Sequence, residues 1–186
     1  RPWHKRQTIE SLHKNMLAHQ SELYIYSDGP RNQKDKKKVN EVRNYIHTIG
    51  GFKSVTIRER QKNLGLANSV IRGVTEIVNK HGTIIVLEDD LLTSLYFLKF
   101  MNDALNYYKD INRVISIHGY VYPLKARLPE TFFLKDTGCW GWATWKRGWK
   151  LFERDGSLLL NEIRERRLST DFDFQNSYPF TRMLEK

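Results

Sequence analysis

The run TIIVL, residues 83–87, constrains the fold of this chain more than any other feature. It is apolar toward both faces of a strand, so a strand made from it needs cover on both sides. A short run of this kind between turn signals is typical of a central strand in a parallel sheet that carries helices on its faces. We therefore expect an α/β fold built around residues 83–87.

The segments around this run alternate between helical and strand patterns. We expect strands at ELYIYS, FKSVTIRE and RVISIHG, and helices over residues 7–19, 35–48, about 66–82 and 94–108. This alternation predicts β-α-β units with right-handed crossovers and a mostly parallel sheet. After residue 120 the chain turns to Pro, Trp and Gly, which predicts an irregular sheet-edge region and then a helix from about residue 145 into the 160s.

Length, charge and cysteine content narrow the class of protein. The 186 residues suit one domain with a well-formed core. The formal net charge of +10 admits nucleic acid, anionic membranes or phosphorylated small molecules as partners. The basic residues are dispersed and no helix-turn-helix, zinc or RNA-recognition signature occurs, so we expect no nucleic-acid partner. The single cysteine, Cys139, excludes an internal disulfide and favours a reducing compartment, and no apolar run approaches the roughly 20 residues of a membrane span.

Polar residues stand at the carboxyl ends of three predicted strands. Asp28 follows ELYIYS, the triplet Glu88, Asp89 and Asp90 follows TIIVL, and His118 ends RVISI. In a parallel sheet these ends meet at one edge, where ligands bind. The three adjacent carboxylates repel one another. Either a divalent cation such as Mg²⁺ or Mn²⁺ belongs beside them, or they cap the next helix, and position alone leaves both interpretations open.

Two further residues have both a structural and a functional interpretation. Asp28, in SDGP, is in isolation a typical turn residue. Asn63 and Gly65, in KNLGLANS, would bring backbone N–H groups close to a phosphate at the start of a helix, or would simply form a loop.

The order of the motifs RP, SDGP, NLGLANSV, VLEDDL, VISIHGY and CWGWATWKRGW resembles that of GT-A fold glycosyltransferases. The similarity is to bacterial sugar transferases related to the N-acetylglucosaminyltransferase I group, and it extends from Arg1 to about Trp149. It implies one partial GT-A (Rossmann-like) domain, truncated at the first strand and at the C-terminal end, that is inactive when isolated. Residues 1–119 would form the donor-binding part and residues 120–186 the acceptor side.

The resemblance also implies roles for individual residues. Asp90 would bind Mn²⁺ or Mg²⁺, and Asp136 would be the catalytic base, although Asp136 is equally a turn-forming residue before Gly138. The residues expected to bind the nucleotide-sugar are Arg1, Asp28, Asn63, Glu88 and Asp89. Those expected on the acceptor side are His118, which is also an alternative base, Trp140 and Trp142.

The resulting expectation is a metal-dependent, inverting transfer of a sugar from a UDP-sugar to a hydroxyl of a glycan or glycolipid, in surface polysaccharide or lipopolysaccharide synthesis. We expect a cytoplasmic protein at the inner face of the membrane, with peripheral membrane association. The alternatives are a nucleotidyltransferase-like enzyme, which the lack of glycine in RPWHKRQ disfavours, a nucleic-acid-binding module, and a non-catalytic remnant that acts as a binding module.

Overall fold

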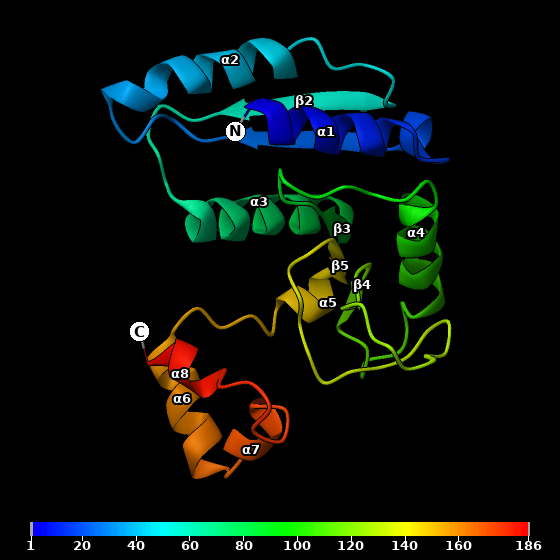
Figure 1. Ribbon diagram of the computed structural model, residues 1–186, viewed down its shortest axis with the longest axis vertical. Coiled ribbons are helices and arrows are strands. Elements are labelled where there is room, and N and C mark those ends of the chain that lie inside the picture. The colour runs from blue at the N-terminus through cyan, green and yellow to red at the C-terminus, as the bar shows by residue number, and fades with distance from the viewer. Residues whose placement is uncertain (1, 186) are drawn as a thin grey trace. The chain divides into compact units, whose positions relative to one another are not determined.

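The computed structural model describes residues 2–185, and the chain divides into two compact units, residues 1–149 and 150–186. Helices and strands alternate in the first unit, which confirms the expected mixed α/β class (Figure 1). The functional division that we expect at residue 120 is a different boundary, and it stays a prediction.

The first unit opens with a β-α-β arrangement, as the sequence predicts. Helix α1 (Pro2–His13) and the short 3-10 helix η1 (Ala18–Gln20) precede strand β1 (Glu22–Ser27). The 3-10 helix η2 (Gln33–Asp35) and helix α2 (Lys36–Ile46) then lead to strand β2 (Ser54–Glu59), which pairs with β1 in parallel along its whole length. Asn32 caps η2 by accepting from the Asp35 N–H, and Ile46 is fully buried. The alternation of the sequence was therefore a reliable guide for residues 22–59.

The next helices also follow the predicted pattern. Helix α3 (Leu66–His81) ends at Gly82, whose φ of 81° is a left-handed conformation that glycine adopts without strain. Strand β3 (Thr83–Val86) follows directly, and helix α4 (Phe97–Tyr107) comes after an extended loop. The helix expected from residue 94 begins three residues later, at Phe97, and no side chain caps it.

The structure does not form the mostly parallel sheet that the sequence predicts. Strand β3 pairs antiparallel with β5 (Trp142–Trp145), and β5 pairs antiparallel with β4 (Ser116–His118). The only parallel pair in the described chain is β1–β2. The expectation that TIIV is a central strand is therefore wrong, because β3 lies at the edge of this sheet in the described chain. The central strand is WATW, the aromatic and β-branched segment just before the short helix α5 (Lys146–Trp149), which lies between β3 and β4.

Helix α4 covers this second sheet and forms the main core with it. Ala143 is fully buried, and the Trp145 ring donates from Nε1 to the Leu105 carbonyl at 3.1 Å. Arg147 lies over the Trp145 ring and donates to three carbonyls at the end of α4 and in the loop after it. The buried cluster consists of Leu12, Phe97, Leu98, Met101, Leu105, Ile117, Ala143 and Trp145.

The two sheets of the first unit are separated by a cavity of about 1030 Å³. Every residue of β1 and every residue of β3 borders it. The Arg60 N–H donates to the Ser27 carbonyl, so by the alternation of a parallel pair the main-chain groups of Tyr24 and Tyr26 point away from β2. In the antiparallel pair the Lys146 N–H donates to the Gly82 carbonyl, so the main-chain groups of every second residue of β3 point to β5. The main-chain groups of Ile85 therefore point away from β5. The cavity is thus flanked by two strand edges without a strand partner in the described chain.

The second unit is helical. It contains α6 (Gly156–Glu165), α7 (Ser169–Phe172) and α8 (Thr181–Leu184). Asp155 caps α6 by accepting from two backbone N–H groups, and the buried Asp173 accepts from the N–H and hydroxyl of Thr181. The single helix predicted from residue 145 into the 160s is wrong, because α5 and α6 are separate. No helix in the described residues has the length and apolar character needed to cross a membrane.

Candidate functional site

Asp28, at the carboxyl end of β1, is held by three segments. Its Oδ1 accepts from Arg60 Nη1 at 3.1 Å and from the Ser69 hydroxyl at 3.0 Å, and its Oδ2 accepts from the Leu64 N–H at 2.9 Å. These contacts join the end of β1 to the end of β2 and to the start of α3. Asp28 therefore has an architectural role at this strand end, and Oδ2 keeps the greater capacity to accept a bond from a ligand.

Asn63 joins the loop after β1 to the loop between β2 and α3. Its Nδ2 donates to the Gly29 carbonyl at 3.0 Å, and its Oδ1 accepts from the Gly65 N–H at 3.1 Å. The N–H of Gly65, one of the two residues expected to approach a phosphate, is thus bonded to Asn63, and the neighbouring Leu64 N–H is bonded to Asp28. A phosphate at this position would have to displace those bonds.

The carboxylate triplet lies in the loop after β3. Glu88 is half-buried and accepts a hydrogen bond from the Cys139 thiol. Asp89 pairs with Lys5 of α1 at 3.7 Å, and Asp90 is exposed. Because α4 begins seven residues later behind Tyr96, these acids do not cap it, and the helix-cap interpretation is wrong.

The environment of Glu88 disfavours its charged form. Burial raises the pKa of Glu88, and the nearby Asp90 and Asp89 raise it further, while the bond from Cys139 opposes the rise. Burial together with Glu88 also raises the pKa of Cys139, which makes this cysteine a poor nucleophile at neutral pH.

Helix α1 fixes the loop that carries the triplet. Asn15, only 4% exposed, donates from Nδ2 to the Thr93 hydroxyl at 3.0 Å and accepts from the Leu98 N–H at 2.9 Å. The Thr93 N–H in turn donates to the Ser11 hydroxyl. With the Lys5–Asp89 pair, these bonds hold the acidic loop at both ends. Lys5 and Asn15 were not predicted from the sequence, since nothing in their local pattern indicates a partner about 80 residues away.

The triplet has the donor chemistry for a hard divalent cation but does not form a closed cage. No group of three or more His, Cys, Asp or Glu side chains within residues 2–185 is placed to hold a metal ion together. Glu88 and Asp89 bond in different directions, which leaves Asp90 as the available carboxylate. One carboxylate together with substrate phosphates and water is a common way for proteins to hold Mg²⁺, so the residues fit such an ion.

His118 and Asp136 lie close enough to interact. Burial lowers the pKa of His118, whereas Asp136 and a bond to the Gly138 backbone oppose that shift. The Ser116 hydroxyl lies 2.9 Å from His118 Nε2. The Asp136 carboxylate accepts from the N–H of the next residue, Thr137, at 2.7 Å. His118 and Asp136 thus remain two candidate bases, brought together by the fold.

The two tryptophans occupy different positions. Trp142 pairs with Val86 on one side and with His118 on the other, so it lies between the ends of β3 and β4. Trp140 packs against Tyr120 and Tyr122 in the preceding loop. These tyrosines, in the segment GYVYP, were not among the predicted site residues.

The predicted site residues form two neighbouring groups. Asp28, Asn63, Glu88 and Asp89 all border the cavity between β1 and β3. His118, Asp136, Trp140 and Trp142 gather around the ends of β4 and β5, and the Cys139–Glu88 bond links them to the acidic loop. Arg1 lies outside the described residues.

Comparison of the chain with protein-family models, with curated proteins and with solved structures finds no match. The resemblance to GT-A glycosyltransferases therefore rests on the motifs of the chain itself.

Proposed function

We propose that this chain is the donor-binding part, with some of the acceptor side, of a metal-dependent GT-A fold glycosyltransferase. The observation that carries the proposal is the shared position of two strand ends. Asp28, after β1, and Glu88 and Asp89, after β3, border the same cavity although some 60 residues separate them. Ligands of open α/β sheets bind at such strand ends.

The gap between the two sheets supports the same fold. In a doubly wound sheet of order 3-2-1-4, the first strand lies between the second and the fourth. If β1, β2 and β3 are the second, third and fourth strands, the position of the first is the cavity between β1 and β3. The free edges on both sides are what a GT-A sheet without its first strand leaves.

The side chains suggest a division of labour. Asp90 would hold a divalent cation, which when bound neutralises charge on the departing nucleoside diphosphate. Asp89, positioned by Lys5, and Glu88 would accept hydrogen bonds from donor hydroxyls. Asp136 would take the proton from the acceptor hydroxyl, and that oxygen would attack the anomeric carbon with inversion. His118 is the alternative base, because its lowered pKa keeps the ring neutral and able to accept a proton at pH 7.

The biological setting belongs to the proposal as well. The acceptor would be a glycan or glycolipid of the cell surface, and the protein would work at the cytoplasmic face of the membrane with peripheral association.

Calorimetry with UDP, in the presence and absence of Mn²⁺, tests the proposal. Mn²⁺ should strengthen UDP binding, and Asp90→Asn should weaken the metal-dependent part by about tenfold or more, because a lost bond to a charged group costs about 1.5–3 kcal/mol. Asp110→Asn, a change at an exposed acid after α4, is the matched control and should bind as the wild type does. UDP binding that ignores both Mn²⁺ and Asp90→Asn would contradict the assignment of Asp90.

A non-catalytic binding module is the second candidate. The internal bonds of Asp28, Leu64 and Gly65 favour it, because they occupy groups that a nucleotide would otherwise use. The lack of hydrolysis or transfer from any of a panel of UDP-sugars, measured on the full-length protein, would support this candidate over the enzyme. A nucleotidyltransferase would instead release diphosphate from a nucleoside triphosphate.

A further inference from the structure

Positive charge is concentrated in the first third of the chain. Residues 1–62 hold fourteen Lys and Arg and six Asp and Glu, so this third carries a net charge of +8. The remaining 124 residues contribute +2 to the total of +10. The basic residues are therefore less evenly dispersed than expected, and such an asymmetry favours an anionic partner at one part of the surface.

Most cations of this region have a partner within the fold, but one group does not. Ion pairs with carboxylates engage Lys5, Arg31, Arg43, Lys53, Arg58 and Arg60. Four exposed lysines form no ion pair with any residue in the described range 2–185, namely Lys34, Lys36, Lys37 and Lys38. We call these four residues the lysine cluster.

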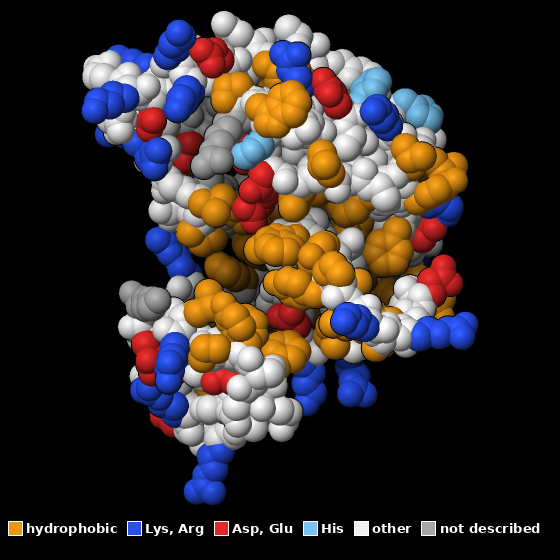
Figure 2. Space-filling model, in the orientation of Figure 1, with side chains coloured by type: hydrophobic (Ala, Val, Ile, Leu, Met, Phe, Trp, Pro, Cys, Tyr) orange, Lys and Arg blue, Asp and Glu red, His pale blue; other side chains and the backbone are white. Residues whose placement is uncertain are grey.

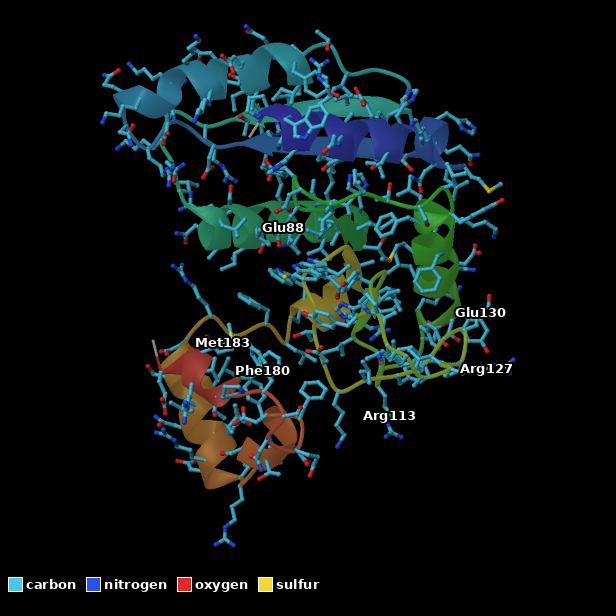
Figure 3. All side chains as sticks on the ribbon, in the orientation of Figure 1. Glu88, Arg113, Arg127, Glu130, Phe180 and Met183 are labelled. Atoms are coloured by element: carbon cyan, nitrogen blue, oxygen red, sulfur yellow. The ribbon has the colours of Figure 1, made fainter. Side chains whose placement is uncertain are left out.

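The lysine cluster surrounds one end of a helix. Lys34 belongs to η2, and the other three are the first residues of α2. Consecutive helical residues point about 100° apart, so three of them cover about 200° around the axis instead of forming a stripe along one face. Figure 2 shows Lys and Arg side chains gathered over this start of α2, at the upper left. In Figure 3 the side chains at this end of the helix extend outward, whereas Glu88 lies well away from them.

The lysine cluster is electrostatically unfavourable for the fold itself. Helix α2 has no acidic residue in its first turn, where the positive end of the helix dipole lies. The one carboxylate between these lysines in sequence, Asp35, is already paired with Arg31 at 3.0 Å. The lysines therefore repel one another and the helix dipole, and anions outside the chain would relieve that repulsion.

The surroundings of the lysine cluster discriminate among anionic partners. A helix that lies in a DNA groove is basic along its exposed side, but the next exposed residues of α2 are Asn40, Glu41 and Asn44, and Glu41 would repel phosphates. Single-stranded nucleic acid needs exposed rings for stacking, and the one aromatic residue of α2, Tyr45, is half-buried beneath Arg6. A flat anionic surface, in contrast, meets the helix end alone. Compact, mobile lysine charges suit such a surface, whereas bidentate recognition of single phosphates favours arginine.

We infer that the lysine cluster docks this unit on an anionic phospholipid bilayer. The cluster adjoins the cavity between β1 and β3, because Arg31, Asp35 and Lys38 border that cavity together with Asp28. Docking would thus bring the carboxyl end of β1 close to the lipid headgroups. The inference deepens the peripheral association of the proposed function, and it rests on that function for one point, namely that a glycolipid acceptor lies in the same bilayer.

Co-sedimentation of the whole chain with large phospholipid vesicles tests the inference. The vesicles contain either phosphatidylcholine alone or phosphatidylcholine with one-third anionic phosphatidylglycerol. We expect binding to the anionic vesicles alone, and its loss in about 1 M salt, where the Debye length is about 3 Å. The triple substitution Lys34→Gln, Lys36→Gln and Lys37→Gln should weaken binding about fiftyfold or more, since each lysine near an anionic surface contributes about fivefold. Lys38 is kept because it borders the cavity.

A second triple substitution is the matched control. Lys109→Gln, Lys125→Gln and Lys150→Gln together remove the same net charge from exposed lysines outside the cluster. This control should bind anionic vesicles within about twofold of the wild type, because charges more than a Debye length from the bilayer are screened. In urea denaturation the cluster triple should be as stable as the wild type or more stable, because it removes charges that the helix dipole disfavours.

The outcomes separate the docking surface from its alternatives. Vesicle binding that the cluster triple loses and the control triple keeps supports the inference. Equal loss in both triples, binding to phosphatidylcholine alone, or a cluster triple that is much less stable than the wild type overturns it. Binding of a single-stranded or duplex DNA oligonucleotide that the cluster triple loses, without vesicle binding, overturns the bilayer in favour of nucleic acid.

Calorimetry with UDP and Mn²⁺ on the same proteins separates the inference from the proposed function. The cluster triple should bind UDP as the wild type does, since Asp90 is unchanged. Vesicle binding through the cluster without any UDP binding supports the docking surface and overturns the glycosyltransferase. UDP binding without vesicle binding overturns the docking surface alone.

Discussion

The acidic triplet shows how one turn divides three like charges among different partners. Glu88 turns toward Cys139, Asp89 toward Lys5, and Asp90 toward solvent. The sequence placed these residues at a strand end but did not reveal this division, because Lys5 and Cys139 are far from the triplet in the chain. The arrangement is unfavourable for the charged form of Glu88, which is the half-buried member and has the raised pKa.

That raised pKa predicts a pH-dependent stability. The folded-state pKa of Glu88 lies above its unfolded value of 4.5, so between the two the native state binds more protons than the unfolded state. The stabilising contribution of the protonated form is complete below pH 4.5 and is lost as the pH rises through the folded-state pKa. Glu88→Gln, which removes this loss, should raise the free energy of unfolding relative to the wild type at pH 7, as measured by urea denaturation.

The control for this prediction is the same pair of proteins at pH 4. There Glu88 is largely protonated in both states, so the difference between Glu88→Gln and the wild type should disappear. An equal difference at pH 4 and pH 7 would show that the substitution acts through packing or through the Cys139 bond instead of through charge.

At the scale of elements, the sequence pattern predicted the helices and strands that depend on residues close together in the chain. The strands β1 and β2 and the helices α2 and α3 follow from periodicity, and the end of α3 follows from Gly82, because each depends on neighbours in sequence. The strand β5 was not predicted, since WATW lies within a segment whose Pro, Trp and Gly content predicts irregular structure. Its insertion between β3 and β4 is a long-range pairing, and the same TIIV run fits a parallel or an antiparallel neighbour equally well. The contacts of Asp28 and Asn63 also depend on long-range pairing, because the position of β2 determines where Arg60 and the loop after it lie.

The joint between the β1 and β2 loops gives a prediction about Gly29. A Cβ at this position would lie 2.4 Å from the backbone oxygen of Gln61, and backbone cannot move aside as a flexible side chain does. Gly29→Ala should therefore destabilise the protein by about 1–3 kcal/mol, the usual cost of overpacking. Gly50→Ala is the matched control, because nothing lies within 4 Å of a Cβ there, and it should be neutral or stabilising by about 0.4–1 kcal/mol. Thermal or urea denaturation measures both, and equal effects of the two changes would contradict the close packing of these loops.

At the scale of the whole chain, the cavity between β1 and β3 is the part of the first unit that the packing of its side chains does not fill. It is bordered by the apolar side chains of Ile25, Val74 and Ile85 as well as by Asp28 and Glu88. Empty cavity volume costs about 24 cal/mol per Å³ in buried cores, so a sealed cavity of this size would exceed the stability of a typical domain. The cavity is therefore tolerable only if water enters it or another strand occupies it.

Amide exchange along single strands distinguishes water from a strand. In β1 the N–H groups of Leu23 and Ile25 point to β2, whereas those of Tyr24 and Tyr26 point to the cavity. In β3 the N–H of Ile84 points to β5 and that of Ile85 to the cavity. With water in the cavity, Tyr24, Tyr26 and Ile85 should exchange about tenfold or more faster than their neighbours, as NMR-detected exchange resolves residue by residue. Uniform protection along both strands would mean instead that a further strand pairs with both edges, and would join the two sheets into one.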